Sequence, residues 1–357
     1  MISVRVRKQF AAAPGSVAFT LDLEFTAGPG VTVLFGPSGA GKTLTLECIA
    51  GFLRPDAGRI ELDGLLLFDG VSGVCLPPQE RHCGYVFQNY ALFPHMSLRS
   101  NLDFAAERLP RLERHRKVQE MLDRFHLEEV AGRFPHELSG GQRQRGSVAR
   151  ALLAAPKMVL LDEPARGLDA PLRAELHEVI REVREGFQLP VVLVTHDLEE
   201  CFALGDRMQV VCEGRIVQSG TPESIVEQPA SLEVARLLGL YDLFQAEVRS
   251  LDPGARTSRL RVGEYELAAP YLPGKFKGDR VWMYVLPERV KAVPREGQRA
   301  GANRIPATLE RTVERPQGMR LEFTNGLRAE VPREEFAAWG STREWLIEFP
   351  PGELRAL

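Results

Sequence analysis

The chain has 357 residues, of which 44% are hydrophobic and 26% are charged, and its formal net charge is −3. These values are typical of globular proteins and argue against a disordered or fibrous chain, while the length favours a large domain followed by a smaller one. So small a net charge gives no long-range attraction to nucleic acid or to an anionic membrane surface, and nucleic acid is not an expected partner.

The cysteines, the start of the chain and the longest uncharged stretch near its front limit the cellular setting. The five cysteines are odd in number and show no C-x-x-C spacing, which argues against a disulfide framework and a zinc site and favours a reducing compartment. The start, MISVRVRKQF, has basic residues without an apolar run behind them, so we do not expect a signal peptide. The stretch Phe25–Gly41 is broken by glycine and proline and predicts no membrane helix.

The first predicted elements are strands. Residues 2–7 and 17–25 alternate between apolar and polar side chains, and residues 31–35 form a short apolar run that ends at a glycine. The segment after Lys42, TLTLECIAGF, has apolar residues at helical spacing and ends near Gly51. A strand, a glycine-rich loop and a helix are therefore predicted in that order.

The middle of the chain predicts an α/β sheet, and the end predicts a separate β domain. Apolar runs at 158–161 and 191–194 alternate with helical stretches at 142–153 and 171–185, which is typical of parallel βαβ units. Beyond about Tyr241 the pattern changes to short strands with proline and glycine breaks, and all three tryptophans lie there. We therefore predict an α/β domain of residues 1–240 and a mostly β domain of residues 241–357.

Two finer features are predicted within the β-rich tail. Residues 321–331 alternate around Asn325-Gly326, the dipeptide that best suits a type I′ hairpin turn. A division of the tail into two small β modules near residues 294–302 is an open alternative to a single module.

A phosphate-binding loop is predicted between the strand at 31–35 and the helix that follows it. GPSGAGKT matches the pattern G-x-x-x-x-G-K-[ST] in the required strand–loop–helix context. Backbone N–H groups and the helix N-terminus favour phosphate there, Lys42 can reach the outer phosphates, and Thr43 can ligate magnesium. The candidate nucleotide-binding residues of this loop are Gly36, Pro37, Ser38, Gly39, Ala40, Gly41, Lys42 and Thr43.

Two adjacent carboxylates end the predicted strand MVLLDEP at residues 158–164. Adjacent side chains at a strand end point in different directions. Asp162 can therefore hold the magnesium shell, while Glu163 polarises a water molecule that attacks the terminal phosphate. Without other motifs, two adjacent acids at a strand end are more often simply solvated. The phosphate loop in the same chain favours the catalytic interpretation.

LSGGQRQR, at residues 138–145, predicts a second anion-binding helix start, with Ser139 as its N-cap. One nucleotide rarely needs two such helix ends from one chain. The run resembles the signature of ABC-transporter ATPases, in which it closes on the ATP bound by the partner subunit. The resemblance implies a head-to-tail dimer that shares two ATP sites, with the candidate contacts Ser139, Gly140, Gly141 and Gln142.

The resemblance extends over roughly the first 240 residues and implies the ABC-type P-loop fold with a helical subdomain, and ATP and Mg²⁺ as cofactors. Gln88 in GYVFQNYALFPH resembles the Q-loop glutamine, which also ligates magnesium, and His196 in VTHD resembles the switch histidine. Both are then expected near the terminal phosphate. Adenine would stack on Phe10, with Phe19 as a rival.

Two positions depart from the pattern of the resembled family. After the carboxylate pair the chain has ARGLD, where related importers usually carry an SALD or SNLD type of run. Asp169 is kept, so this loop is expected to cross the dimer interface, but Arg166 and Gly167 leave its hydrogen bonds with the partner's phosphate loop open. Gly146, just after the signature, costs about 1 kcal/mol of helix preference relative to alanine.

Two other classes of protein use a phosphate loop. The segment between Lys42 and Ser139 is too short for the coiled coil of chromosome and repair ATPases, and the chain has one cassette, which argues against a soluble ABC ATPase acting on DNA or ribosomes. A small-molecule kinase would need neither LSGGQ nor the histidine.

One cassette without a membrane helix and with a β-rich tail resembles importer subunits, whose tails carry small oligonucleotide-fold-like modules. The link after Gly64, LLLFDGVSGVCLPP, the run ERHCGYVFQ and the tail stretch 303–330 resemble the molybdate group more than the sugar group. Molybdate or tungstate is therefore the favoured solute, and sulfate, polyamine, sugar and iron importers stay open. The tail would either bind an oxyanion or only dimerise.

The same resemblance implies the partners and the location. The ATPase would sit on the cytoplasmic face of the inner membrane beneath transmembrane permease subunits, and would act with a periplasmic solute-binding protein indirectly. Residues 89–102 would form part of a groove that receives a short helix from the permease. The alternative is that Tyr90, Phe93 and Met96 pack inside the helical subdomain.

Overall fold

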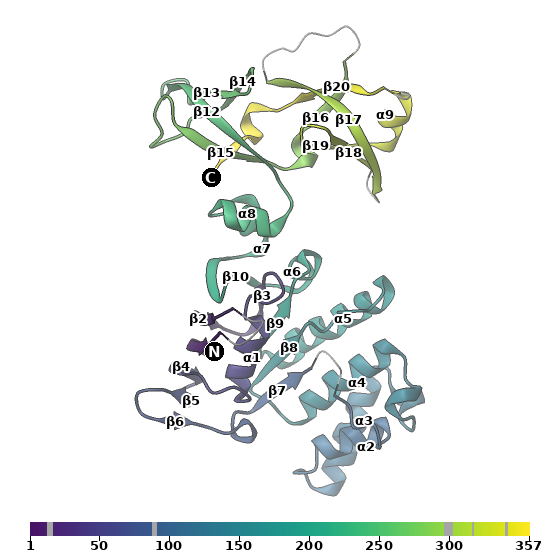
Figure 1. Ribbon diagram of the computed structural model, residues 1–357. Coiled ribbons are helices and arrows are strands. Elements are labelled where there is room, and N and C mark those ends of the chain that lie inside the picture. The colour runs from purple at the N-terminus through teal and green to yellow at the C-terminus, as the bar shows by residue number, and fades with distance from the viewer. Residues whose placement is uncertain (13–16, 88–90, 296–302, 316–317, 340–341) are drawn as a thin grey trace. The chain divides into compact units, whose positions relative to one another are not determined.

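The computed structural model describes residues 1–12, 17–87, 91–295, 303–315, 318–339 and 342–357. The chain divides into two compact units, Met1–Gln228 and Pro229–Leu357, and each is described by itself (Figure 1). Within the described ranges, no helix combines the length and the apolar character needed to cross a bilayer.

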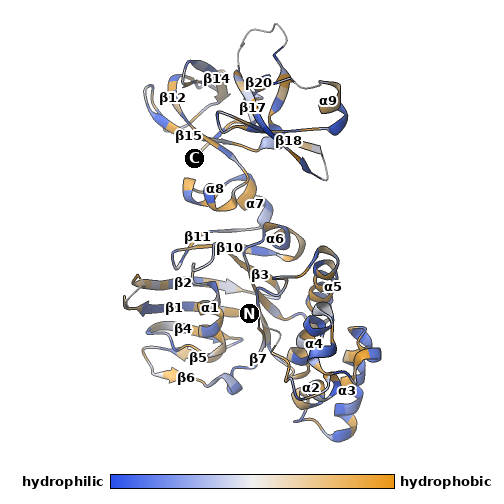
Figure 2. Ribbon diagram, turned by 45° about the vertical axis from the view of Figure 1, so that its right-hand side comes forward, coloured by the Kyte–Doolittle hydropathy of each residue, from blue (hydrophilic) through white to orange (hydrophobic). Residues whose placement is uncertain are grey.

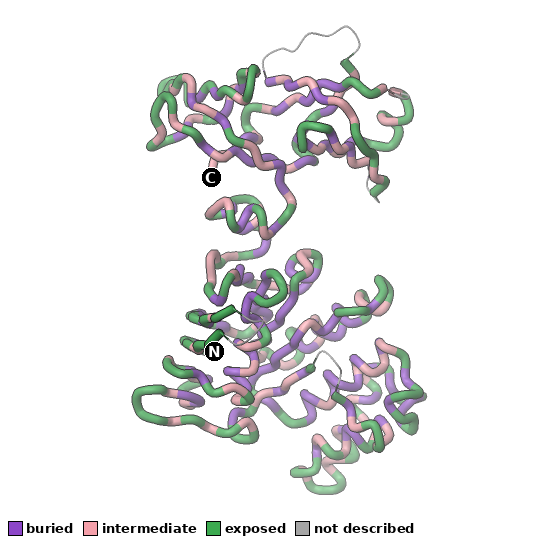
Figure 3. Tube along the Cα trace, viewed as in Figure 1, coloured by how far each residue is buried: buried purple, intermediate pink, exposed green. Residues whose placement is uncertain are grey.

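The first unit begins with a five-stranded antiparallel sheet of order β2-β1-β4-β5-β6. Buried apolar residues alternate with exposed polar ones along β1, where Ile2, Val4 and Val6 are buried. One face of the sheet therefore covers a core. Its strands are β1 (Ile2–Phe10), β2 (Phe19–Ala27), β4 (Ala57–Leu62), β5 (Leu65–Asp69) and β6 (Val74–Cys75). Figure 2 colours the chain by hydropathy and Figure 3 by burial.

The second sheet of this unit has six strands in the order β11-β10-β3-β9-β8-β7. Its strands are β3 (Gly30–Phe35), β7 (Cys83–Val86), β8 (Met158–Asp162), β9 (Pro190–Thr195), β10 (Arg207–Cys212) and β11 (Arg215–Gly220). All neighbours pair in parallel except β10 and β11. Strands β8 and β9 are buried along their whole length, as expected when both faces of a parallel sheet are covered.

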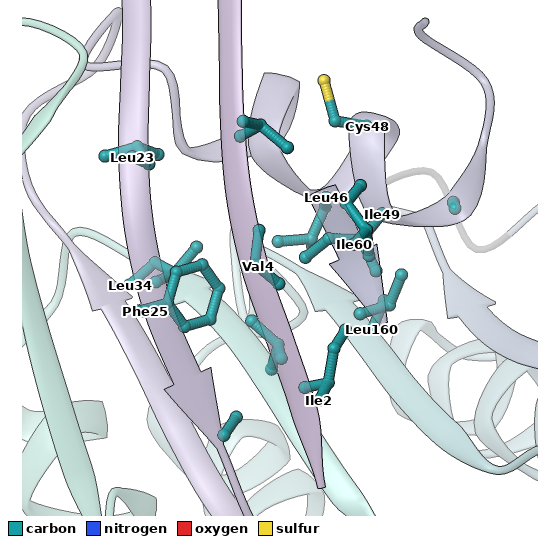
Figure 4. Close-up of a cluster of buried hydrophobic side chains, with 14 of the residues drawn as sticks. Ile2, Val4, Leu23, Phe25, Leu34, Leu46, Cys48, Ile49, Ile60 and Leu160 are labelled. Atoms are coloured by element: carbon teal, nitrogen blue, oxygen red, sulfur yellow. The ribbon is translucent and has the colours of Figure 1, made fainter. Parts of the chain in front are cut away.

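The helices of the first unit take two places. Helix α1 (Lys42–Ala50) contributes Leu46 and Ile49 to the same buried cluster as residues of both sheets (Figure 4). Helices α2, α3 and α4 gather beyond β7 as a helical subdomain (Figure 1). The remaining bounds are α2 (Leu98–Ala105), α3 (Arg111–Arg124), α4 (Gly140–Leu153), α5 (Ala170–Phe187), α6 (Leu198–Leu204) and α7 (Pro222–Glu227), with short 3₁₀ turns at Pro78–Glu80, Glu128–Val130 and Pro135–Glu137.

Gly146, which is unfavourable as a helix residue, has a packing role. It is buried inside α4, and a β-carbon added to it would lie 2.6 Å from Cδ1 of Leu98 at the start of α2. The glycine therefore allows the two helices to approach closely, and this offsets its low helix preference.

The second unit contains α8 (Leu232–Leu238) and two five-stranded sheets, of order β14-β13-β12-β15-β21 and β16-β20-β17-β18-β19. One cluster of buried side chains, which includes Trp345, is formed by residues of both sheets. The bounds are β12 (Asp242–Asp252), β13 (Thr257–Val262), β14 (Tyr265–Pro270), β15 (Arg280–Val285), β16 (Lys291–Pro294), β17 (Arg304–Arg315), β18 (Gly318–Phe323), β19 (Arg328–Val331), α9 (Arg333–Ala338), β20 (Glu344–Glu348) and β21 (Arg355–Ala356), with 3₁₀ turns at Pro287–Arg289 and Pro351–Glu353.

The structure divides the chain earlier than the sequence suggested. The units meet at Gln228, before the boundary predicted near Leu240. Helix α8 goes with the second unit, where the guanidinium carbon of Arg236 lies 5.4 Å from the centre of the Trp282 ring.

The two sheets of the tail are not consecutive stretches of the chain. The chain passes to the second sheet between β15 and β16, ahead of residues 294–302, and returns to the first sheet with β21, which pairs with β15. Residues 296–302 lie outside the described ranges. Because both sheets share one core, they form a single packed body.

The hairpin predicted at Asn325-Gly326 is present between β18 and β19, but its turn is not type I′. The loop spans residues 324–327, and of the central pair only Gly326 has a positive φ, of 79°. A type I′ turn needs positive φ at both central residues of a two-residue loop. The longer loop allows Leu327 to be buried in the core.

Candidate functional site

The phosphate loop joins β3 to α1, and its backbone requires glycine at defined positions. Gly41, which caps α1, has a φ of 98°. A β-carbon on Gly36 would lie 2.1 Å from the carbonyl oxygen of Val211, which no side chain tolerates. The loop can therefore curl tightly at the helix N-terminus and leave its N–H groups for an anion.

Lys42 points back into this loop. Its ammonium donates hydrogen bonds to the carbonyl oxygens of Gly36 (2.7 Å) and Pro37 (2.8 Å), and the residue is 4% exposed. Burial lowers the pKa of Lys42, and the nearby carboxylates of Glu163 and Asp162 oppose that shift. The cation is thus held inside the curve of the loop, where phosphate oxygens can replace its carbonyl partners.

Asp162 and Thr43 lie together although they are far apart in sequence. The Thr43 hydroxyl donates to Asp162 Oδ1 at 2.9 Å, and the Tyr85 hydroxyl donates to Asp162 Oδ2 at 3.3 Å. Burial raises the pKa of Asp162, while the hydrogen bonds from Thr43 and Tyr85 oppose the rise. Tyr85 is a site residue that the sequence analysis missed, because nothing local to GYVFQ shows that β7 pairs beside β8.

Thr43 and Asp162 are suited to hold magnesium that is bound together with a nucleotide. Among the described residues, no group of three or more histidine, cysteine, aspartate or glutamate side chains could hold a metal by itself. Magnesium prefers oxygen donors and is usually held by one or two carboxylates together with substrate phosphates. One hydroxyl and one carboxylate beside a phosphate loop meet that requirement. Gln88, the third predicted ligand, lies outside the described residues.

Glu163 contacts other residues than Asp162 does, as expected for adjacent residues at a strand end. Its backbone has a φ of 44°, and its N–H donates to the Val194 carbonyl at 3.0 Å. One carboxylate oxygen, Oε1, lies 3.6 Å from Nδ1 of His196, and the other, Oε2, accepts a hydrogen bond from Arg166 at 3.0 Å. The strained backbone places this carboxylate between a histidine and an arginine.

The adenine-stacking candidates lie side by side. Phe10 and Phe19 pair across β1 and β2, with ring centres 6.2 Å apart. A β-carbon on Gly41 would lie 3.1 Å from Cζ of Phe19, so Phe19 packs directly on the end of the phosphate loop. The predicted residue, Phe10, is its neighbour one strand away.

The signature segment opens α4 with a capping box. Ser139 Oγ accepts from the Gln142 N–H at 3.2 Å, and the Ser139 N–H donates to Gln142 Oε1 at 3.0 Å. Gly141 is buried, and a β-carbon there would lie 2.6 Å from Cδ2 of Leu172 in α5. This helix start belongs to the helical subdomain, whereas the phosphate loop belongs to the parallel sheet (Figure 1).

The unusual ARGLD run forms the turn between β8 and α5. Asp169 caps α5 by accepting a hydrogen bond from the Leu172 N–H at 3.0 Å. Arg166 pairs with Glu163 of its own chain, and Gly167 has a φ of 76° with open space around it. The arginine that departs from the expected pattern therefore contacts the candidate base directly.

Comparison with known proteins gives one family model and several relatives. The family model described as ABC transporter matches residues 20–166. The molybdenum import ATP-binding protein ModC of Paramagnetospirillum magneticum is 41% identical over 245 residues, which cover 68% of this chain and 67% of that protein. The spermidine/putrescine import ATP-binding protein PotA of Nitratidesulfovibrio vulgaris is 45% identical over 230 residues, which cover 64% and 61%.

A solved structure shares its fold with part of the chain. The dimeric structure of MJ0796, a bacterial ABC transporter cassette, superposes with a TM-score of 0.54 at 25% identity, covering 62% of this chain and 99% of that one. With the phosphate loop, the paired acids, the signature helix and the histidine in place, this chain belongs to the ABC transporter family and resembles the ATP-binding subunits of its importers.

Proposed function

We propose that the chain is the ATP-hydrolysing subunit of an importer. The observation that carries the proposal is the meeting of Lys42, Thr43, Asp162, Glu163 and His196 at one edge of the parallel sheet. Strands β3, β8 and β9 run parallel, with Phe35 beside Thr195 and Asp162 beside Val194, so residues that follow their carboxyl ends converge. This is where ligands bind in open α/β sheets.

Each side chain takes a separate part in the proposed reaction. The loop N–H groups and Lys42 would hold the phosphates of ATP. Thr43 would ligate magnesium, and Asp162 would hold the shell of ligands around that ion. Bound magnesium neutralises charge on the phosphate oxygens. Glu163 would take a proton from the attacking water, and His196, 3.6 Å away, would orient that carboxylate and contact the terminal phosphate.

The dimer is proposed from the second anion-binding helix end. Helix α4 has 14 residues, so its N-terminus carries a positive potential suited to phosphate. We assign Ser139, Gly140, Gly141 and Gln142 to the ATP of a second copy of the chain, with Asp169 near the same interface. The dimeric state of the MJ0796 cassette supports this arrangement.

Permease subunits are proposed as the membrane partners, on the cytoplasmic face of the inner membrane, with a periplasmic solute-binding protein acting indirectly. A pocket of about 540 Å³ between the helical subdomain and the residues before β7 could receive a short helix. Phe104 and Leu109 line it, together with His82 and Leu153. The residues that line this pocket lie outside the range 89–102 that was predicted for the groove. Of that range, Asn89 and Tyr90 lie outside the described residues, and Phe93 packs edge-on against Phe104 with ring centres 5.1 Å apart.

Molybdate or tungstate is the proposed solute, because of the likeness to the molybdenum import protein. The likeness to the spermidine/putrescine import protein keeps polyamines as an alternative, and sulfate, sugars and iron stay open. We also propose that the tail, alone or as a pair in the dimer, senses a tetrahedral oxyanion. Calorimetry of the full chain with molybdate, tungstate and sulfate tests this; no heat with any of them would leave the tail as a dimerisation element.

The ATPase assignment is tested by Glu163→Gln. The variant keeps the shape of the side chain and should bind ATP normally, but hydrolysis should slow by about 100 to 10,000 fold, or ~3 to 5 kcal/mol of barrier. Size-exclusion chromatography should show it as an ATP-bound dimer, which Ser139→Arg in the same background should abolish. Glu178→Gln, at an exposed acid on α5, is the matched control. A Glu163→Gln protein that stays monomeric at saturating ATP, or hydrolyses at the wild-type rate, contradicts the shared site.

A further inference from the structure

A buried carboxylate lies behind the turn that carries His196. Glu200, in α6, is only 3% exposed. Its Oε2 accepts a hydrogen bond from the Thr195 hydroxyl. Its Oε1 has no hydrogen-bond partner among the described residues and lies 3.8 Å from Nε2 of His177, which is also buried without such a partner. A carboxylate is costly to bury, so an apolar residue would be expected here if packing were the only requirement.

The Thr195 hydroxyl accepts one hydrogen bond and donates another, and only one assignment of donor and acceptor fits both. The Asp197 N–H donates to Thr195 Oγ1 at 3.0 Å. Because the hydroxyl carries a single proton, that proton must point toward Glu200. Glu200 therefore orients a hydroxyl that in turn holds the backbone of Asp197, and the two residues that flank His196 are tied together through it.

The far side of the same turn is also fixed. Asp197 Oδ2 accepts a hydrogen bond from Arg173 in α5 at 2.8 Å, and Asp197 Oδ1 caps α6 by accepting from the Glu199 N–H at 2.8 Å. With both flanking residues held, His196 is presented to Glu163 by a braced turn. Glu200 and Thr195 line the same pocket, of about 110 Å³, as Glu163 and His196.

We propose that Glu200 is a positioning residue of the hydrolytic site, acting through Thr195 on the placement of His196. The proposal rests on the function proposed above. Glu200 need not contact nucleotide or the attacking water. Its part is to hold the hydroxyl of Thr195, so that the imidazole keeps its distance from the Glu163 carboxylate, and small misplacements of such groups are costly for rate.

The test compares steady-state ATP hydrolysis by the full chain and its variants at saturating Mg-ATP. Glu200→Ala should lower kcat about tenfold and leave KM within about twofold, because the phosphate loop is untouched. Glu200→Gln keeps an oxygen that can accept from Thr195, and should restore most of the rate. Thr195→Val should match Glu200→Ala, and Thr195→Ser should not. Glu199→Ala, one residue away with 87% of its side chain exposed, is the control.

Repeating the measurement in the His196→Ala variant separates a positioning role of Glu200 from a general role in stability. If Glu200 acts through His196, Glu200→Ala should cause no further loss of kcat once His196→Ala is present. An undiminished loss in that background, or unchanged kcat in Glu200→Ala and Thr195→Val alike, overturns the proposal. If Glu200→Ala does not fold, as judged by thermal melting, Thr195→Val gives the decision. A wild-type chain that does not hydrolyse ATP, or a Glu163→Gln variant as active as wild type, would instead refute the proposed function.

Discussion

Removing the guanidinium of Arg166 should raise the rate of ATP hydrolysis, although the residue borders the site. Its Nη1 lies 3.0 Å from Oε2 of Glu163, so the ion pair occupies one oxygen of the carboxylate proposed to receive the proton from water. If this oxygen must be free in the reacting state, the pair has to open first. Arg166→Ala removes that step.

The structure limits how large the effect can be. The Arg166 side chain is 55% exposed, whereas that of Glu163 is 11% exposed. Two unit charges about 3 Å apart attract by about 1.4 kcal/mol in water, and measured pairs with this much exposure contribute roughly 0.2–1 kcal/mol after solvent screening. Losing the pair can therefore lower the barrier by at most about 1 kcal/mol, which corresponds to a rise in kcat of about fivefold.

Phosphate release at saturating Mg-ATP, measured at low and high salt, checks the prediction. Salt screens an exposed pair, so the ratio of variant to wild-type rate should fall toward one as ionic strength rises. Arg181→Ala removes an exposed arginine in the same i,i+3 relation to a glutamate, Glu178, away from the site, and serves as the control. A fall in rate on Arg166→Ala, or a rise of tenfold or more, would refute the reasoning.

Three further outcomes are expected. Because burial raises the pKa of Asp162, the folded chain holds this proton more tightly than the unfolded chain does, and stability from protonation is lost as pH rises through the folded pKa. Asp162→Asn should therefore raise the Tm of the nucleotide-free chain at pH 7. It should leave Tm unchanged below about pH 4, which is near the pKa of an unfolded aspartate, and the variant should lose magnesium-dependent hydrolysis. An unchanged Tm at pH 7 counts against the burial argument. Gly146→Ala should lower the free energy of unfolding, measured by urea titration, by about 1 kcal/mol. Overpacking against Leu98 should outweigh the higher helix propensity of alanine. A stabilised variant would show that the leucine moves aside. The fragments 241–357 and 229–357 should both unfold cooperatively, the longer one at higher temperature because it keeps α8; absence of a transition in both would mean that the tail has no core of its own.

The sequence was sufficient wherever the determining interactions are local. The loop at residues 36–43 could be placed because its glycines, its lysine and its neighbouring strand and helix lie within one short segment. Predicted helices at 142–153 and 171–185 agree with α4 and α5 to within two residues, since capping and apolar spacing act over a few residues. The α/β fold class with a β-rich tail followed from the same signals and is confirmed.

Only the tertiary structure showed which of these segments meet. Thr43 and Asp162 are joined by a hydrogen bond across 119 residues of sequence, because β8 lies beside β9, and β9 beside β3. That strand order depends on how apolar faces pack, and no local pattern encodes it. Tyr85 became a site residue for the same reason.

The least predictable features were those whose cost or benefit depends on burial. Glu200 looks like an ordinary helix glutamate in the sequence, and only its position behind Thr195 makes it an unusual one. In the sequence, Arg166 was a departure from the family pattern in a loop expected at the dimer interface. The turn after β8 brings its guanidinium to the Glu163 carboxylate. Local sequence therefore determined the chemistry that is available, whereas packing decided which groups are desolvated, because burial depends on neighbours distant in the chain.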